Sequence, residues 1–193
     1  MLTTTIDLDA IAHNTRRLRE QTTAELMCVV KADAYNHGVK RCVPVMEANG
    51  ADAFGVATFA EARRVRELTT KPVLAWLWDP HEELPDGVDV AAPSMTHLHS
   101  LIDAPTAPTV YLKVDTGMHR SGIDEVRWQE AFEVALDAQR EGKLEVAGLM
   151  THFSCADDPA DPYTDQQAAA FRRAIAQARQ VGLEVPRNHA ANS

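Results

Sequence analysis

Short apolar runs, rich in β-branched residues, alternate along the chain with longer amphipathic stretches. The short runs are typical of buried strands and the longer stretches of helices. Strands are predicted at residues 26–30, 52–57, 72–77, 88–91, 109–114, 144–150 and 187–193. Parallel strands need long crossover connections, usually helices, so this alternation is how a parallel sheet is encoded. The sequence therefore predicts an α/β fold.

Helices are predicted at residues 9–20, 39–48, 59–68, 94–101, 125–141 and 161–181. Thr58 and Ser94 stand where helix N-caps are expected, and Glu61, three residues after Thr58, completes a capping box. In the first helix we expect Ile11 and Leu18 to face inward. Glycines follow several of the predicted helices, as is usual at helix C-termini.

Seven strand units approach the eight-stranded (β/α) barrel, which typically needs about 250 residues. The chain has 193 residues, enough for one domain or a little more. A doubly wound open sheet uses the same alternation of strands and helices, so the pattern alone leaves both architectures open.

Composition excludes some classes of partner. Apolar residues make up 45% of the chain, enough for a substantial core, and the formal net charge is -9. A nucleic acid or an anionic membrane surface needs clustered Lys and Arg, so neither is expected as a partner. No run of 18 apolar residues is present, and the N-terminus has no signal-peptide pattern.

The cysteines and histidines do not form a metal-site pattern. Cys28, Cys42 and Cys155 have a spacing that fits no zinc site or disulfide framework, and a reducing cytoplasm suits them best. His97 and His99 lie in a predicted helix with no third ligand evident. We therefore assign no metal and expect a cytoplasmic protein.

Lys31 is the first candidate for chemistry. It stands where the apolar strand at residues 26–30 ends, and Tyr35 follows about one helical turn later. Burial lowers the pKa of a lysine amine, and a neutral amine can condense with an aldehyde to form a Schiff base. This is how enzymes attach pyridoxal phosphate. A lysine that simply extends from the strand end into solvent is the alternative.

The stretch from Lys31 to Gly38 reads Lys-Ala-Asp-Ala-Tyr-Asn-His-Gly. It resembles the cofactor-lysine signature of the bacterial alanine racemases, with Asn36 where the family usually has glycine. The resemblance implies a fold-type III pyridoxal phosphate barrel of the (β/α)8 TIM type, followed by a β-rich C-terminal domain. It also implies that Lys31 carries pyridoxal 5'-phosphate and is catalytic, with Tyr35 beside it.

A second stretch, from Lys113 to Gly122, is similar to the family's second signature. The resemblance implies that Arg120 donates to the phenolic oxygen of the cofactor and approaches the substrate carboxylate. An ion pair of Arg120 with Asp115 or Asp124 is the alternative. Lys113 lies seven residues before Arg120, and two neighbouring cations repel in a low dielectric. In many family members the matching lysine is carbamylated; pairing with Asp115, or neutralisation, would also relieve the repulsion.

Other candidates lie at further strand ends, where barrel enzymes carry their working residues. By the same resemblance, Trp76 flanks the cofactor, His152 lies next to its ring, Asn192 belongs to its pocket and Ser193 binds its phosphate. A core tryptophan and a structural histidine remain the alternatives for Trp76 and His152.

The resemblance covers essentially the whole chain. It implies that residues 1–193 are the N-terminal, pyridoxal phosphate-binding barrel domain of an alanine racemase, truncated before the eighth strand, with the C-terminal β domain absent. Such an isomerase interconverts L- and D-alanine for cell-wall peptidoglycan synthesis by a two-base reaction, as a homodimer. In that reaction Lys31 serves the D-face and a tyrosine of the partner's C-terminal domain serves the L-face.

We therefore expect the fragment alone to be inactive and to associate with itself. Three alternatives stay open. The chain could be a non-catalytic pyridoxal phosphate barrel, a racemase of another amino acid such as serine, or an α/β interaction domain whose Lys31 binds nothing.

Overall fold

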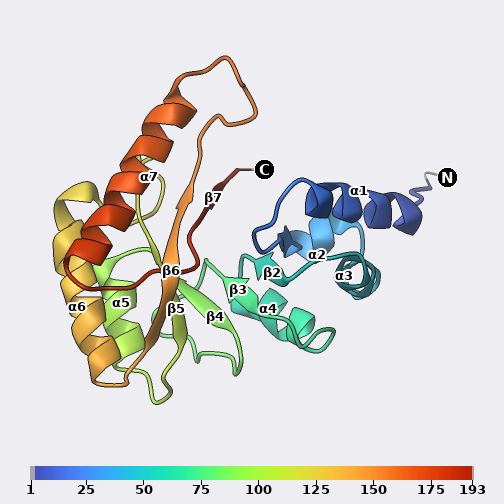
Figure 1. Ribbon diagram of the computed structural model, residues 1–193. Helices are drawn as coiled ribbons and strands as arrows, with labels where there is room; N and C mark the ends of the chain where they lie inside the picture. The colour runs from blue at the N-terminus through green and yellow to red at the C-terminus, as the bar shows by residue number, and fades with distance from the viewer. Residues whose placement is uncertain (1–2, 193) are drawn as a thin grey trace. The chain divides into compact units, whose positions relative to one another are not determined.

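The computed structural model describes residues 3–192, which divide into two compact units, one up to Asp89 and one from Val90 onward (Figure 1). In both units strands and helices alternate along the chain, and every assigned strand pair is parallel. The α/β class predicted from the sequence is therefore confirmed.

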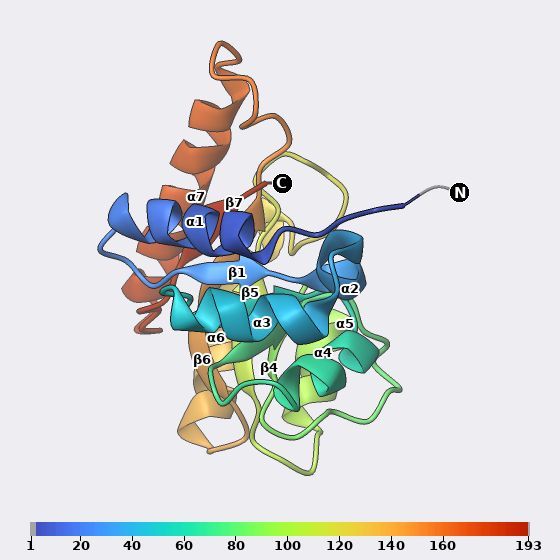
Figure 2. The same cartoon turned by 90° about the vertical axis from the view of Figure 1, so that its right-hand side faces the viewer.

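The first unit contains three strands in the order β1-β2-β3 and four helical segments. The strands are β1 (Met27–Val29), β2 (Ala53–Val56) and β3 (Val73–Ala75); the helices are α1 (Leu8–Glu20), α2 (Lys31–Asn36), α3 (Val39–Ala48) and α4 (Phe59–Arg66). Phe54 of β2 pairs with Cys28 of β1 and with Val73 of β3, and is completely buried. Helix α1 contacts α3, and β1 is seen between the two helices in the view of Figure 2.

The second unit contains four strands in the order β4-β5-β6-β7. The strands are β4 (Asp89–Ala92), β5 (Thr109–Lys113), β6 (Glu145–His152) and β7 (His189–Ala191); the helices are α5 (Met95–Ile102), the short 3-10 turn η1 (Glu125–Arg127), α6 (Trp128–Arg140) and α7 (Tyr163–Gln180). Helices α5, α6 and α7 lie on one side of these strands (Figure 1). Trp128, Phe132, Leu112 and Leu149 are completely buried and belong to the core of this unit.

Local side-chain bonds explain where several helices begin. Helix α4 starts at the predicted capping box, in which Thr58 Oγ1 accepts from the Glu61 amide at 3.3 Å. Helix α5 starts after Ser94, whose hydroxyl accepts from the His97 amide at 3.3 Å. Satisfying an otherwise unpaired N–H of the first turn in this way typically stabilises a helix by about 1 kcal/mol.

Two details of the prediction are wrong. Leu18 was expected to face inward but is 53% exposed, because the buried position of this helix is Thr15, whose hydroxyl bonds the Ile11 carbonyl at 2.9 Å. The helix expected from residue 125 begins as the 3-10 turn η1, and the α-helical part starts at Trp128. The segment α2 was not predicted.

Candidate active site

Lys31 lies two residues after Val29, the last residue of β1, and is therefore close to the strand end that the sequence predicts. Its side chain is half-buried, and its Nζ atom lies 5.6 Å from the centroid of the Tyr35 ring. An ammonium group at this distance is attracted by the electron-rich face of an aromatic ring. The structure therefore brings together the two side chains that were expected to face one ligand.

The backbone that carries these side chains is a left-handed turn. From Ala32 to Tyr35, φ lies between 51° and 55° and ψ between 42° and 51°, and Asn36 follows with φ at 65°. For an L-residue, this left-handed helical conformation costs roughly 1–2 kcal/mol relative to the right-handed helical conformation. The sequence signals this geometry at Asp33, Asn36 and Gly38, whereas neither alanine nor tyrosine favours positive φ.

Hydrogen bonds and burial hold the turn in place. The Ala34 amide donates to the Val30 carbonyl at 2.9 Å, and the Gly38 amide donates to the Asp33 carbonyl at 2.9 Å. Asp33 Oδ1 accepts from the Val39 amide at 2.9 Å and so anchors the first residue of α3. The Ala34 side chain is buried. A conformation as costly as this one persists only when its surroundings fix it in this way.

Trp76 follows β3 and packs against β2. A Cβ atom added to Gly55 would lie 2.7 Å from Trp76 Cζ3, so the indole ring occupies the space that a larger residue at this position would fill. The ring is only partly buried. The absence of a side chain at Gly55 is therefore what lets the indole lie so close to the strand.

The stretch from Lys113 to Gly122 leaves the end of β5 and folds back on it. The Ile123 amide donates to the Lys113 carbonyl at 2.8 Å, and the Asp115 amide donates to the Ile123 carbonyl at 3.0 Å. Gly122 has φ at 140°, and a Cβ there would meet the Asp115 nitrogen at 2.6 Å. Glycine is thus required where the loop closes.

Lys113 is buried to 6% exposure at the end of β5. Burial, and then the positive charge of Arg120, lower the pKa of the Lys113 amine, while Asp115 raises it. The direction of this pKa shift agrees with the repulsion between Lys113 and Arg120 that the sequence suggested.

Asp115 does not pair with Arg120. Its Oδ1 accepts from the Gly117 amide at 2.9 Å and the His119 amide at 3.1 Å, and its Oδ2 lies 3.1 Å from His119 Nδ1. Among residues 3–192, no ion pair joins Arg120 to Asp115 or Asp124. The surface ion pair considered from the sequence is therefore wrong, and the exposed Arg120 side chain stays available for an anionic ligand.

Strand register places Lys113 and His152 on one face of the second unit's sheet. Lys113 pairs with Met150, and His152 lies two residues further along β6, so all three side chains project to the same side. Both residues stand at the carboxyl ends of their strands. This is the arrangement that the sequence predicted for polar residues in a barrel.

Gln167 was missed by the sequence analysis. It is completely buried in α7, where its Oε1 accepts from the Ser154 amide at 2.9 Å and its Nε2 donates to the His152 carbonyl at 3.2 Å and to Thr116 Oγ1 at 3.3 Å. Thr116 Oγ1 lies 2.9 Å from Thr151 Oγ1. This polar network ties the loop after β5 to the end of β6. A glutamine inside an otherwise amphipathic helix gives no sequence signal of such a role.

Asn192 follows β7, and its Nδ2 donates to Asp157 Oδ1 at 2.9 Å in the loop after β6. Asn188, another residue that was missed, accepts from the Leu149 amide at 2.8 Å and donates to the Val185 carbonyl at 2.7 Å, which positions the start of β7 on β6. The phosphate-binding role expected of Ser193 lies outside the described residues.

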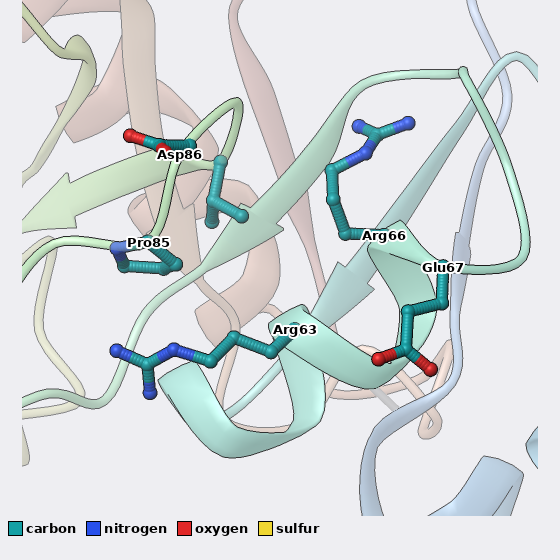
Figure 3. A pocket seen from close by; sticks show the side chains of 6 residues that line it. Arg63, Arg66, Glu67, Pro85 and Asp86 are labelled. Carbon is teal, nitrogen blue, oxygen red and sulfur yellow. The ribbon is translucent and has the colours of Figure 1, made fainter.

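A cavity of about 230 Å³ in the first unit is lined by the C-terminal part of α4 and by residues between 85 and 88, and by none of the candidate site residues (Figure 3). Its guanidinium groups already have partners: Arg63 donates to the Glu83 carbonyl at 3.0 Å, and Arg66 donates to the Lys71 carbonyl at 2.7 Å and to the Thr69 carbonyl. The cavity is also smaller than most ligand pockets, which measure about 300–1,000 Å³. We assign it no ligand.

Comparison with known proteins identifies the family. A family model described as "Alanine racemase, N-terminal domain" matches residues 6–193. The alanine racemase of Corynebacterium efficiens is 54% identical over 202 residues, which cover 100% of this chain and 54% of that relative. The alanine racemase of Corynebacterium glutamicum strain R is 49% identical over 200 residues, covering 100% of this chain and 55% of that relative.

Solved structures agree. The crystal structure of alanine racemase from Corynebacterium glutamicum matches with a TM-score of 0.94 at 48% identity, covering 100% of this chain and 57% of that chain. The enzyme of Streptomyces lavendulae matches with a TM-score of 0.91 at 35% identity, covering 97% of this chain and 52% of that chain.

The fold is therefore that of an incomplete (β/α) barrel, to which residues 3–192 supply seven strands, and the doubly wound alternative is wrong. With Lys31 and Lys113 at the carboxyl ends of strands, the chain belongs to the alanine racemase N-terminal domain family. It spans about half the length of the curated relatives it matches.

Proposed function

We propose that this chain is the barrel portion of a pyridoxal phosphate-dependent alanine racemase, which interconverts L- and D-alanine for cell-wall synthesis. The observation that carries the proposal is the position of Lys31, just beyond the carboxyl end of β1, with its amine over the Tyr35 ring. Family membership supports the reaction, since the relatives it matches at about half their length are alanine racemases.

The residues around Lys31 fit the cofactor. The Lys31 side chain is half-buried, and within residues 3–192 no carboxylate forms an ion pair with it. Its amine is therefore available to attach an aldehyde, and the neighbouring Tyr35 ring offers an aromatic surface beside it. Pyridoxal phosphate, when bound, supplies an electron sink that makes the Cα proton of an amino acid removable.

The protein's own residues then handle the proton and the charges. We assign Lys31 the proton on the D-face of alanine, and a tyrosine outside this chain the proton on the L-face. Arg120, exposed and without an acidic partner in residues 3–192, is assigned to the substrate carboxylate, which a planar guanidinium can bind through two hydrogen bonds. Trp76, His152, Asn192 and Ser193 are assigned to the cofactor pocket.

Chemical labelling tests the proposal. Full-length protein is incubated with pyridoxal phosphate, reduced with borohydride and digested, and the modified peptide is identified by mass spectrometry. Label on Lys31 supports the proposal, and Lys31→Arg should abolish both the label and alanine racemisation. Lys40, exposed on α3, is the matched control, and Lys40→Arg should change neither. Label on another lysine, or none in folded protein, contradicts the assignment.

We also propose that the full-length protein is a homodimer, as the family resemblance implies, and that residues 1–193 alone associate for a separate reason. β1 pairs only with β2, and β7 only with β6, in the part of the chain that the structure describes, so each strand has an unpaired edge. Unpaired edges recruit other strands. We therefore expect residues 1–193, expressed alone, to self-associate and to show no alanine turnover. Size in solution, followed over protein concentration, tests this, and a stable monomer contradicts it.

A cytoplasmic location is the last part of the proposal. Cys28 and Cys42 are buried and Cys155 is partly exposed, and all three are free thiols. Burial, and then Asp52, raise the pKa of the Cys28 thiol to about 11, which keeps it protonated and unreactive. In residues 3–192, no helix has the length and apolar character to cross a membrane. Thiol counting on protein from fractionated cells tests the compartment.

A further inference from the structure

Glu61 uses its two carboxylate oxygens for different elements. Oε2 accepts from the Ala57 amide at 2.8 Å and from the Thr58 amide at 3.1 Å, and so belongs to the capping box of α4. Oε1 accepts from the Ala32 amide at 2.8 Å, 29 residues earlier in the chain. Capping the helix needs only the first oxygen, so the second bond is an additional contact.

Ala32 is the residue at which that contact matters for chemistry. It follows Lys31 directly and is the first residue of the left-handed turn, with φ at 51°. Its amide nitrogen is bonded to the Lys31 carbonyl carbon, so fixing this N–H fixes the peptide plane next to the lysine. The hydrogen bond from the Ala32 amide to Glu61 therefore links the start of α4 to the residue at which the backbone becomes left-handed.

The charge of Glu61 suits this position. The Glu61 carboxylate accepts three hydrogen bonds, and all three donors are backbone N–H groups. A carboxylate accepts on both oxygens, and bonds to an ionised acceptor are stronger than bonds between neutral groups. Glutamine has one acceptor oxygen and an amide that donates, so it can serve α4 or Ala32 but not both.

We propose that Glu61 is a positioning residue for Lys31: its Oε1 holds the Ala32 amide and thereby fixes the turn that presents the lysine amine to the cofactor aldehyde. The inference rests on the proposed function of Lys31 and adds to it a residue that does not touch the ligand. Asp33 fixes the other end of the same turn through the Val39 amide. The lysine is thus presented by a segment anchored by an acidic side chain at each end.

The test compares Glu61→Gln with Thr58→Ala in the full-length protein. Thr58→Ala removes the hydroxyl oxygen that accepts from the Glu61 amide and so weakens the cap, but it leaves the Ala32 contact in place. Two quantities are measured: the urea midpoint of unfolding, and the rate at which Lys31 is labelled by pyridoxal phosphate and borohydride, read from the mapped peptide. Both variants should lower the midpoint.

Only Glu61→Gln should slow the labelling of Lys31, by about tenfold, the loss expected for one hydrogen bond to a charged group. Equal labelling rates in the two variants would overturn the inference, because Glu61 would then act as a cap alone. If Lys31 is not labelled in the unsubstituted protein, the proposed function fails before the comparison begins.

A backbone variant keeps the test decisive if Glu61→Gln does not fold. An ester linkage in place of the amide between Lys31 and Ala32 removes the Ala32 N–H and leaves the capping box of α4 intact. Slower labelling of Lys31 with an unchanged α4 cap supports the inference. Labelling at the rate of the unsubstituted protein contradicts it.

Discussion

The rings of Tyr111 and His189 lie edge to face, with centroids 5.2 Å apart and planes inclined at 62°. Tyr111 is buried in β5 and His189 begins β7, so the contact spans two strands that are separated by β6. Burial lowers the pKa of His189 from its ordinary value of 6.5 to about 4. The ring is therefore neutral in the folded protein at neutral pH.

We predict that stability falls as the pH is lowered from about 6.5 toward 4. In this window the unfolded chain protonates His189 while the folded protein does not, so the free energy of unfolding decreases with decreasing pH. Above about pH 6.5 the effect is absent. Urea unfolding at several pH values measures it. His189→Gln should flatten the dependence of the unfolding free energy on pH, whereas His13→Gln, at an exposed position, should not.

Gln167→Ala should destabilise the protein by about 1–3 kcal/mol, because it leaves the Ser154 amide and Thr116 hydroxyl without their buried partner. Gln166, its exposed neighbour on α7, is the matched control, and Gln166→Ala should change the free energy of unfolding by less than about 0.5 kcal/mol. Chemical denaturation measures both. Equal losses in the two variants would contradict a structural role for the Gln167 network.

Gly55→Ala should destabilise the first unit by about 1–3 kcal/mol, because the new methyl group would meet the Trp76 ring at 2.7 Å. Trp76→Leu in the same protein should recover part of this loss, since a smaller side chain leaves room for the methyl group. The double-mutant cycle is read from unfolding free energies. Additive effects would show that the two positions do not interact.

Lys113 is predicted to carry a carbamate in the full-length protein. Burial and the neighbouring Arg120 lower the pKa of its amine, so more of it is neutral and able to form an N–C bond to carbon dioxide with release of one proton. The resulting anion would neutralise Arg120. Carbon-13 NMR in labelled bicarbonate should show a carbamate signal.

That signal should be absent from Lys113→Met and should persist in Lys143→Met, which changes an exposed lysine paired with Glu141. Lys113→Met should also weaken substrate or cofactor binding, with no rescue by added bicarbonate. A carbamate signal that is unaffected by Lys113→Met, or no carbamate signal at all, would show that the positive charge of Arg120 is neutralised in another way.

Much of the fold follows from local sequence signals. Helix α3 spans the residues that were predicted, because Gly38 precedes it and Asn49 and Gly50 end it. The α4 capping box was predicted from the spacing of Thr58 and Glu61 alone. Such features depend on contacts within one turn of chain, which a sequence displays directly.

The features that were not predicted depend on contacts between distant segments. Gln167 is buried because Thr116 in the loop after β5, His152 at the end of β6 and Ser154 in the loop after β6 all contact it, and nothing in its own helix indicates this. The hydrogen bond from the Ala32 amide to Glu61 is also not evident from the sequence, since the capping box already accounts for the glutamate. The choice of a barrel over an open sheet came from the resemblance to a family, because the pattern of strands and helices is common to both.

The left-handed turn has a consequence for the chirality of the residues within it. Mirror-image amino acids favour positive φ for the same steric reason that natural ones avoid it. Ala32 is exposed, with φ and ψ both at 51°, so a D-alanine placed there by chemical synthesis would adopt this backbone without the penalty that the L-residue bears. At the residue that follows Lys31, the protein therefore adopts a backbone conformation that suits a D-amino acid better than the L-amino acid it contains.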